Sequence, residues 1–262
     1  MRPTPLIAAE LAFMAALVFG VVSGAVPAAR FASAEDALSP AELAKKESIE
    51  RLEKDLRRMA NSPRAEKQKE EMVKALESLG VLGGASAGKA SLAALAFDDP
   101  DIEKAVMKVV EENHAKSLIA PLGAMIDDRD LRRRFRLHAL LAHAFEVIAD
   151  PACLEPLTDL VKSEEPHVVA AAADALATFK TAPHAKRVEP VRRMVDLFES
   201  TWNMKESVHP EDRVPRDRAK NDWEIYGASV KRGLQALTGQ TNLVRPRQFR
   251  DWWNDHKHDA NW

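Results

Sequence analysis

The sequence predicts an all-α protein, an α-solenoid of about five stacked helical hairpins, and three observations support this prediction. Three pairs of identical residues lie 34 positions apart: Phe145 and Phe179, Glu155 and Glu189, Pro156 and Pro190. The repeated segments are rich in helix-forming residues, as is typical of helical arrays with a period in this range. Aromatic residues make up only 6% of the 262-residue chain, and the apolar/polar alternation of β-strands is absent.

Each repeat shows the pattern of two helices. In residues 128–163, inward-facing positions recur every three or four residues in two successive groups: Leu131, Phe135, His138, Leu141 and Phe145, then Leu154, Leu157, Leu160 and Val161. This spacing places each group on one face of a helix. Between the groups, Asp150 suits an N-cap and Pro151 suits the first helical position. A single hairpin cannot bury its apolar face alone, so neighbouring hairpins must stack.

This unit resembles a HEAT repeat. The resemblance rests on the Asp-Pro start of the second helix, on the Ala/Leu-rich first helix at 168–179, and on a proline about one turn inside the second helix, at Pro121, Pro156 and Pro190. It covers roughly residues 66–200. It implies the solenoid fold and says little about activity, because the same repeat serves scaffolds, adaptors and a few enzymes.

The chain divides into four segments. They are a signal peptide at 1–34, a charged N-terminal helix at 35–63, HEAT-like repeats at 64–200, and a long loop with C-terminal capping helices at 201–262. The expected helix pairs lie at 64–97, 100–127, 129–163, 166–200 and 219–257. Ser39 and Glu42 form a capping box at the start of the N-terminal helix. In 201–220, two prolines and nine charged residues interrupt the pattern and indicate a long loop.

The C-terminal segment is rich in tryptophan. Residues 236–239 and 246–253 resemble the closing segment of exported bacterial HEAT-repeat proteins. A solenoid needs a terminal cap over its last apolar face. We therefore expect Trp252 and Trp253 to form a Trp-rich C-terminal cap, with an aromatic ligand cage as the alternative.

The N-terminal segment has the features of an export signal. An uncharged apolar run from Leu11 to Ala29 is followed by Ala32-Ser33-Ala34, whose small residues suit a signal peptidase. We expect an exported protein, periplasmic or extracellular. The alternative is an uncleaved N-terminal membrane anchor, because nineteen residues can span a bilayer.

Residue types that carry chemistry are sparse. Cys153 is the only cysteine, so the chain forms no internal disulfide, and we expect a buried thiol. His138 and His143 are five positions apart, which turns them to different faces of a helix. The net charge of −2, with both signs interspersed, gives no basis for nucleic-acid binding. We expect no catalytic residue, no metal and no cofactor.

A basic cluster precedes the third pair of helices. It consists of Arg129, Arg132, Arg133, Arg134 and Arg136. Helical spacing places Arg129, Arg133 and Arg136 on one face, opposite Leu131 and Phe135. Because the next repeat has no matching charges, we interpret this stripe as a solvated outer face, with the binding of an anion or an acidic partner as the alternative.

These observations favour an exported scaffold or adaptor that binds another protein and has no catalysis of its own. The family resemblance implies a concave face lined by the second helix of each pair. Subtracting the apolar stripe from these helices leaves six candidate partner-binding residues: Thr158, Asp159, Lys162, Arg192, Arg193 and Asp196. The expected partner is a protein and not a nucleic acid, and a membrane is contacted only through an uncleaved signal segment. The alternatives are an enzyme subunit resembling the HEAT-like lyases that attach pigments to antenna proteins, and a purely structural element of an envelope assembly.

Overall fold

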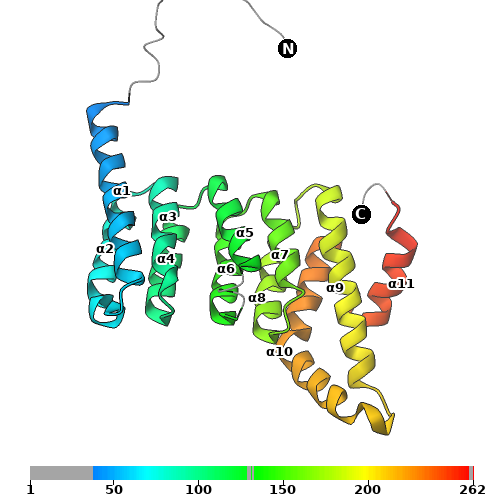
Figure 1. Cartoon of the computed structure of the whole chain (residues 1–262). Coiled ribbons are helices and arrows are strands. Elements are labelled where there is room, and N and C mark those ends of the chain that lie inside the picture. Colours follow the sequence, from blue (N-terminus) through cyan, green and yellow to red (C-terminus); the bar gives the residue numbers. More distant parts are fainter. Residues whose placement is uncertain (1–37, 129–130, 132, 260–261) are drawn as a thin grey trace, which may run out of the picture. The chain divides into compact units, whose positions relative to one another are not determined.

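The computed structural model describes residues 38–128, 131, 133–259 and 262. Within it, Ser39–Trp262 forms one compact unit (Figure 1). The predicted signal peptide at 1–34 lies outside the described residues, so export stays a prediction.

Every regular element in the described part of the chain is helical, which confirms the all-α class. The α-helices are α1 (Pro40–Ala60), α2 (Lys69–Leu82), α3 (Ala85–Ser91), α4 (Pro100–Glu112), α5 (Ile119–Asp127), α6 (Phe135–Ile148), α7 (Leu154–Leu160), α8 (Pro166–Ala177), α9 (His184–Lys205), α10 (Arg213–Thr238) and α11 (Pro246–His256). Short 3₁₀ turns precede α2, α5, α7 and α10, and another follows α3.

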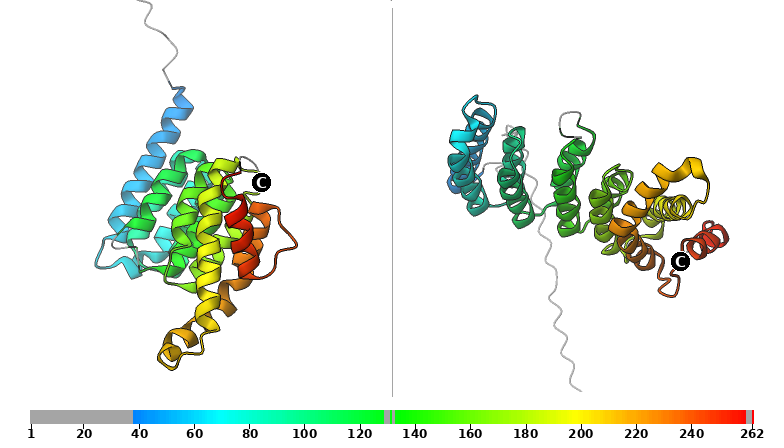
Figure 2. Two further views of the ribbon diagram at one scale, coloured as in Figure 1. Left: turned by 90° about the vertical axis from the view of Figure 1, so that its right-hand side faces the viewer. Right: turned by 90° about the horizontal axis from the view of Figure 1, so that it is seen from below.

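The helices of the compact unit pack in two rows (Figure 2). In the first row, α2, α4, α6, α8 and α10 contact one another in succession. In the second row, α5, α7, α9 and α11 do the same. The α1 helix packs on α2 and α3 at one end, and α10 also packs along α9 at the other. Each α-helix thus covers the apolar face of its neighbours.

The predicted helix starts are confirmed where a short polar side chain caps them. The Ser39 hydroxyl accepts the Glu42 amide at 3.2 Å, and the Glu42 carboxylate accepts the Ser39 amide at 2.8 Å. Asp99 caps α4 by accepting the amide of Ile102 at 3.1 Å. Asp150 accepts the amide of Ala152 at 2.8 Å, at the 3₁₀ turn that leads into α7. These carboxylates and hydroxyls bond amides that have no partner inside the helix.

The recurring prolines lie within the first two turns of three second-row helices. Pro121 and Pro156 are each the third residue of their α-helix, directly after a 3₁₀ turn. Pro190 is the seventh residue of α9, which has no such turn before it. Pro121 and Pro156 fall in the first helical turn, where a missing amide hydrogen breaks no bond.

The predicted long loop at 201–220 is wrong. The α9 helix continues to Lys205 and α10 begins at Arg213, so only residues 206–212 connect them. Trp202 extends the packed face of α9, because its ring lies 4.9 Å from that of Trp223 on α10. Pro215 is the third residue of α10, a position whose amide needs no helical partner. Pro215 is therefore compatible with the first turn of α10 and does not interrupt the helix.

The predicted helix at the start of 129–163 begins later than expected. Leu131 lies before α6, and its amide bonds to the carboxylate of Asp128 at 3.2 Å. Phe135 opens α6 and is 40% exposed. His138, Leu141 and Phe145 are buried as predicted.

The core runs from Ile49 on α1 to Trp253 on α11. Cys153 is fully buried, as predicted, and this burial raises the pKa of its thiol to about 11. The thiol is therefore protonated near neutral pH and unreactive.

Candidate partner-binding groove

Two adjoining hollows lie between α5 and α7, and we call them together the α5–α7 groove. The first hollow, of about 840 Å³, extends toward α6, and its lining includes Arg133, Phe135, His138, Lys162 and Glu164. The second hollow, of about 440 Å³, has a lining that includes Lys116, Ile119, Gly123, Glu155 and Pro156. Ile126, Asp127 and Asp159 line both hollows, so the two adjoin.

Both helices that border the groove are short. The α5 helix has nine residues and α7 has seven, whereas α9 has 22. The facing residues between them are small or compact, at Ala120, Gly123, Ala152 and Pro156. A helix of nine residues is only about 14 Å long. The α9 helix, with 22 residues, is more than twice as long.

The charges of the groove are only partly paired. Lys162 contacts Asp159 at 2.5 Å, and Lys116 contacts Asp150 at 3.3 Å. Four further lining residues form no ion pair with another described residue: Asp127, Arg133, Glu155 and Glu164. These four side chains are exposed, so they are free to meet charges on a partner.

His138 lines the first hollow from α6. Its side chain is buried, with only 5% of the residue exposed, and its Nε2 atom has no hydrogen-bond partner among the described residues. Burial lowers the pKa of the imidazole, which is therefore neutral near neutral pH. A buried polar atom without a partner is unusual in native proteins.

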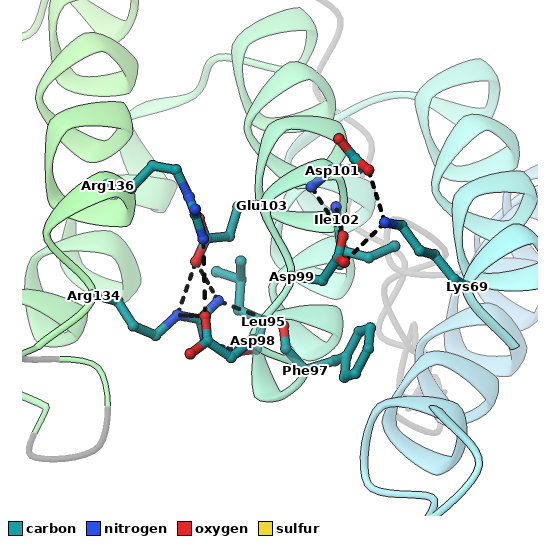
Figure 3. Close-up of polar contacts among 10 residues, drawn as sticks. All are labelled: Lys69, Leu95, Phe97, Asp98, Asp99, Asp101, Ile102, Glu103, Arg134 and Arg136. Carbon is teal, nitrogen blue, oxygen red and sulfur yellow. Dashed lines mark hydrogen bonds and ion pairs between the residues drawn. The ribbon is translucent and has the colours of Figure 1, made fainter. Parts of the chain in front are cut away.

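One wall of the first hollow is held in place by a buried ion pair between α4 and the start of α6 (Figure 3). The fully buried Glu103 carboxylate accepts hydrogen bonds from Arg134 at 2.6 Å and Arg136 at 2.7 Å. Arg134 also donates to the Leu95 carbonyl at 2.5 Å. These contacts fix the position of the backbone next to Arg133. Within the basic cluster, the Arg134 side chain is therefore buried, whereas Arg136 stays exposed while it pairs with Glu103.

Similar ion pairs join other helices of the same row. Between α2 and α4, Lys69 contacts Asp99 at 2.8 Å and Asp101 at 2.7 Å (Figure 3). Burial alone would raise the pKa of Asp99, but the bonds from Lys69 and the α4 amides lower it overall. Between α8 and α10, Asp174 contacts Arg232 at 2.7 Å. Such pairs join neighbouring helices of the first row.

Of the three α7-region residues proposed to bind a partner, two line the groove. Asp159 borders both hollows and Lys162 borders the first. The predicted exposure of Thr158 is wrong, because its residue is only 4% exposed and its hydroxyl donates to the Leu154 carbonyl at 2.5 Å. A threonine bonded back to its own helix carries no free donor for a partner.

The three α9 residues lie elsewhere and are bound within the protein. Arg192 and Arg193 both contact Glu189, at 2.6 Å and 2.8 Å. The Arg192 bond, followed by that of Arg193, lowers the pKa of Glu189 to about 2. Asp196 contacts Arg250 of α11 at 2.6 Å. None of these three candidate residues is among the residues that line the groove.

Several residues of the groove are not among the candidates predicted from the sequence. Asp127 lies 35 positions before Lys162, and Ala120 lies 35 before Glu155, so the repeat offset already relates the two walls. Subtracting the apolar stripe from residues 119–127 in the same way would include Asp127. Arg133 is expected on the outer face only because the predicted helix starts too early.

Two classes of site find no support in the described residues. No group of three or more His, Cys, Asp or Glu side chains is arranged to hold a metal ion there. None of the described helices is both long enough and apolar enough to cross a membrane.

In comparisons with known proteins, no family model, curated protein or solved structure matches the chain. The groove itself must therefore suggest the function.

Proposed function

We propose that this protein is an exported scaffold, a solenoid of HEAT-like hairpins that holds a partner protein in the α5–α7 groove without catalysis. One observation carries this proposal: two adjoining hollows share Asp127 and Asp159 and combine an apolar lining with unpaired charges.

The composition of the groove supports a protein partner. Its lining includes apolar contacts at Ile119, Ile126 and Pro156, and charged groups at Asp127 and Glu155. Protein interfaces typically have such an apolar centre with a polar rim. Ser163 and His138 both line the first hollow, but no hydrogen bond joins them, and the Ser163 hydroxyl accepts the amide of Glu165.

The C-terminal helix supports the solenoid part of the proposal. Trp252 and Trp253 on α11 are 9% and 5% exposed, and α11 packs on α9, the preceding second-row helix. In the proposed solenoid, α11 is the terminal cap that covers the last apolar face of the second row. The proposed export follows from residues 1–34, which resemble a signal peptide.

Affinity capture with the tagged full chain tests the proposal. An envelope extract is passed over the wild-type protein and two variants, and bound proteins are identified by mass spectrometry. The groove variant combines Asp127→Lys with Glu155→Lys, and the control combines Arg192→Glu with Arg193→Glu on α9. Like charges placed together at an interface cost several kcal/mol, so the groove variant should lose the partner and the control should retain it.

The opposite result contradicts the groove as the binding site. If the α9 variant loses the partner and the groove variant keeps it, α9 is the working surface. Far-UV circular dichroism of all three proteins checks that each keeps its helix content, because Arg192 and Arg193 are half-buried and paired with Glu189, whereas Asp127 and Glu155 are exposed.

A further inference from the structure

We infer that the α5–α7 groove receives a partner segment that carries Lys or Arg side chains between small apolar residues. This inference rests on the proposed function of the groove as a partner-binding site. It adds the chemical class of the segment that fits there.

The first argument is the balance of unpaired charge. Two basic lining residues, Lys116 and Lys162, are already paired with Asp150 and Asp159. The lining groups without an ion pair among the described residues are three carboxylates and one guanidinium: Asp127, Glu155, Glu164 and Arg133. Three negative charges against one positive charge leave a net −2, which favours a cationic occupant.

The second argument is where these charges lie. Arg133 and Glu164 line the first hollow only, whereas Glu155 lines the second only and Asp127 lines both. In the second hollow, the unpaired charges are therefore all negative. These carboxylates have no ion-pair partner in the described part of the chain, so a guanidinium or ammonium group of the occupant can bind them without displacing another cation. Hydrogen bonds between such charged groups are stronger than those between neutral groups.

The third argument is the shape of the second hollow. Its apolar lining combines Ala120, Gly123, Ala152 and Pro156, which carry little side-chain volume, with the larger Ile119 and Ile126. A Cβ atom added at Gly123 would lie 3.8 Å from the Pro156 side chain, an ordinary contact. The close packing of α5 on α7 does not require glycine here. The small residues instead let another chain approach closely, with small apolar side chains of its own.

His138 also lines the first hollow, the residue is 5% exposed, and its Nε2 has no partner among the described residues. That atom is itself buried, and either ring nitrogen of a neutral imidazole can carry the proton. His138 therefore does not select between a basic and an acidic occupant, and the inference rests on the charges and the shape of the groove.

Two synthetic peptides test the inference with the full chain. Each is a fluorescein-labelled peptide of about 14 residues, long enough to span both walls of the groove, built from Leu and Ala with several Lys residues in one and as many Glu residues in the other. Fluorescence anisotropy should show the Lys peptide binding at least about tenfold more tightly than the Glu peptide. Asp127→Asn with Glu155→Gln should weaken the Lys peptide at least about tenfold.

A matched control separates the groove from bulk charge. Glu71→Gln with Glu77→Gln removes the same two negative charges from exposed positions of α2, and should leave affinity unchanged. Equal weakening by both double variants, or a preference for the Glu peptide, would overturn the inference.

The two proposals fail in distinguishable ways. If the groove variant loses its captured partner but the Lys peptide does not bind, the basic segment is wrong and the groove remains the binding site. If the groove variant keeps its partner, the proposed function is wrong as well.

Discussion

The α5–α7 region and the α8–α10 region differ in the length of their helices and in how closely these helices cover one another. The α5 and α7 helices have nine and seven residues, whereas α9 and α10 have 22 and 26 and extend beyond their neighbours (Figure 1). The short helices leave two hollows between them. The long helices pack against each other and against α8.

Charges and aromatic rings show the same division. In the C-terminal region, Phe198 stacks on Trp223 at 4.8 Å, and the Thr201 and Tyr226 hydroxyls form a buried hydrogen bond of 2.7 Å. At the groove, Phe135 is 40% exposed and Asp127 has no ion pair among the described residues. The short α5 and α7 helices thus border two hollows, whereas the long α9 and α10 helices pack along each other. Paired substitutions in the two regions test this contrast.

The largest effect is expected at the C-terminal end. Trp252→Ala should lower the free energy of unfolding by about 3–5 kcal/mol, as for other buried tryptophans. Ile126→Ala, at a half-buried groove position, should cost about 1 kcal/mol. Urea unfolding followed by circular dichroism measures both. A cost below about 0.5 kcal/mol for Trp252→Ala would mean that the Trp252 side chain does not stabilise the C-terminal end, and it would favour a ligand-binding role for this residue.

A smaller loss is expected when the buried ion pair behind the groove is broken. Glu103→Ala leaves Arg134, whose side chain is 9% exposed, without its main partner. The cost should be about 3 kcal/mol, the lower end of the range for buried pairs, because Asp98 remains 3.2 Å from Arg134. Asp159→Ala, in an exposed pair, should cost about 1 kcal/mol or less. Equal costs from denaturant unfolding would contradict the structural role of Glu103.

Two glycines should respond with opposite signs. A Cβ atom at Gly233 of α10 would lie 2.8 Å from the Ala173 carbonyl oxygen of α8, so Gly233→Ala should cost about 1–3 kcal/mol. Gly123→Ala has room and should stabilise α5 by about 0.5–1 kcal/mol. Thermal unfolding of the two variants compares them directly. Destabilisation by Gly123→Ala would mean that α5 and α7 are packed as closely as α8 and α10.

The smallest effect concerns pH. The folded pKa of His138 is lowered by burial, while the unfolded value is about 6.5. Below that value the unfolded chain binds more protons, so this contribution to stability falls as the pH decreases. His138→Gln should flatten the decline in unfolding free energy between about pH 7 and 5. His167→Gln, at an exposed residue of α8, should leave the decline unchanged, and equal slopes for all three proteins would contradict the burial of His138.

Much of the fold could be predicted because its signals are local. The Asp150-Pro151 start, the Ser39 cap and the 34-residue offset each depend on residues close in sequence or on a simple period. The predictions were wrong where contacts between residues far apart in the sequence determine the structure. The α6 helix starts late while Arg134 reaches Glu103, 31 residues earlier, and α9 continues where Trp202 meets Trp223.

The groove was harder to predict than the helices around it. Subtracting an apolar stripe found Asp159 and Lys162, but it could not show that Thr158 is buried or that Asp196 is held by Arg250. These outcomes depend on how each helix is rotated against its neighbours. The position of the groove depends on the relative lengths of α5 and α7, which the repeat period does not contain.

Hydrogen–deuterium exchange tests the central claim most directly. Exchange of the full chain is measured by mass spectrometry, alone and with the captured partner protein. If the partner binds in the α5–α7 groove, the amides of 119–127 and 152–164 should exchange more slowly in the complex, and those of 184–238 should be unchanged. Slower exchange in 184–205 and 246–256, with 119–127 and 152–164 unaffected, would contradict the account.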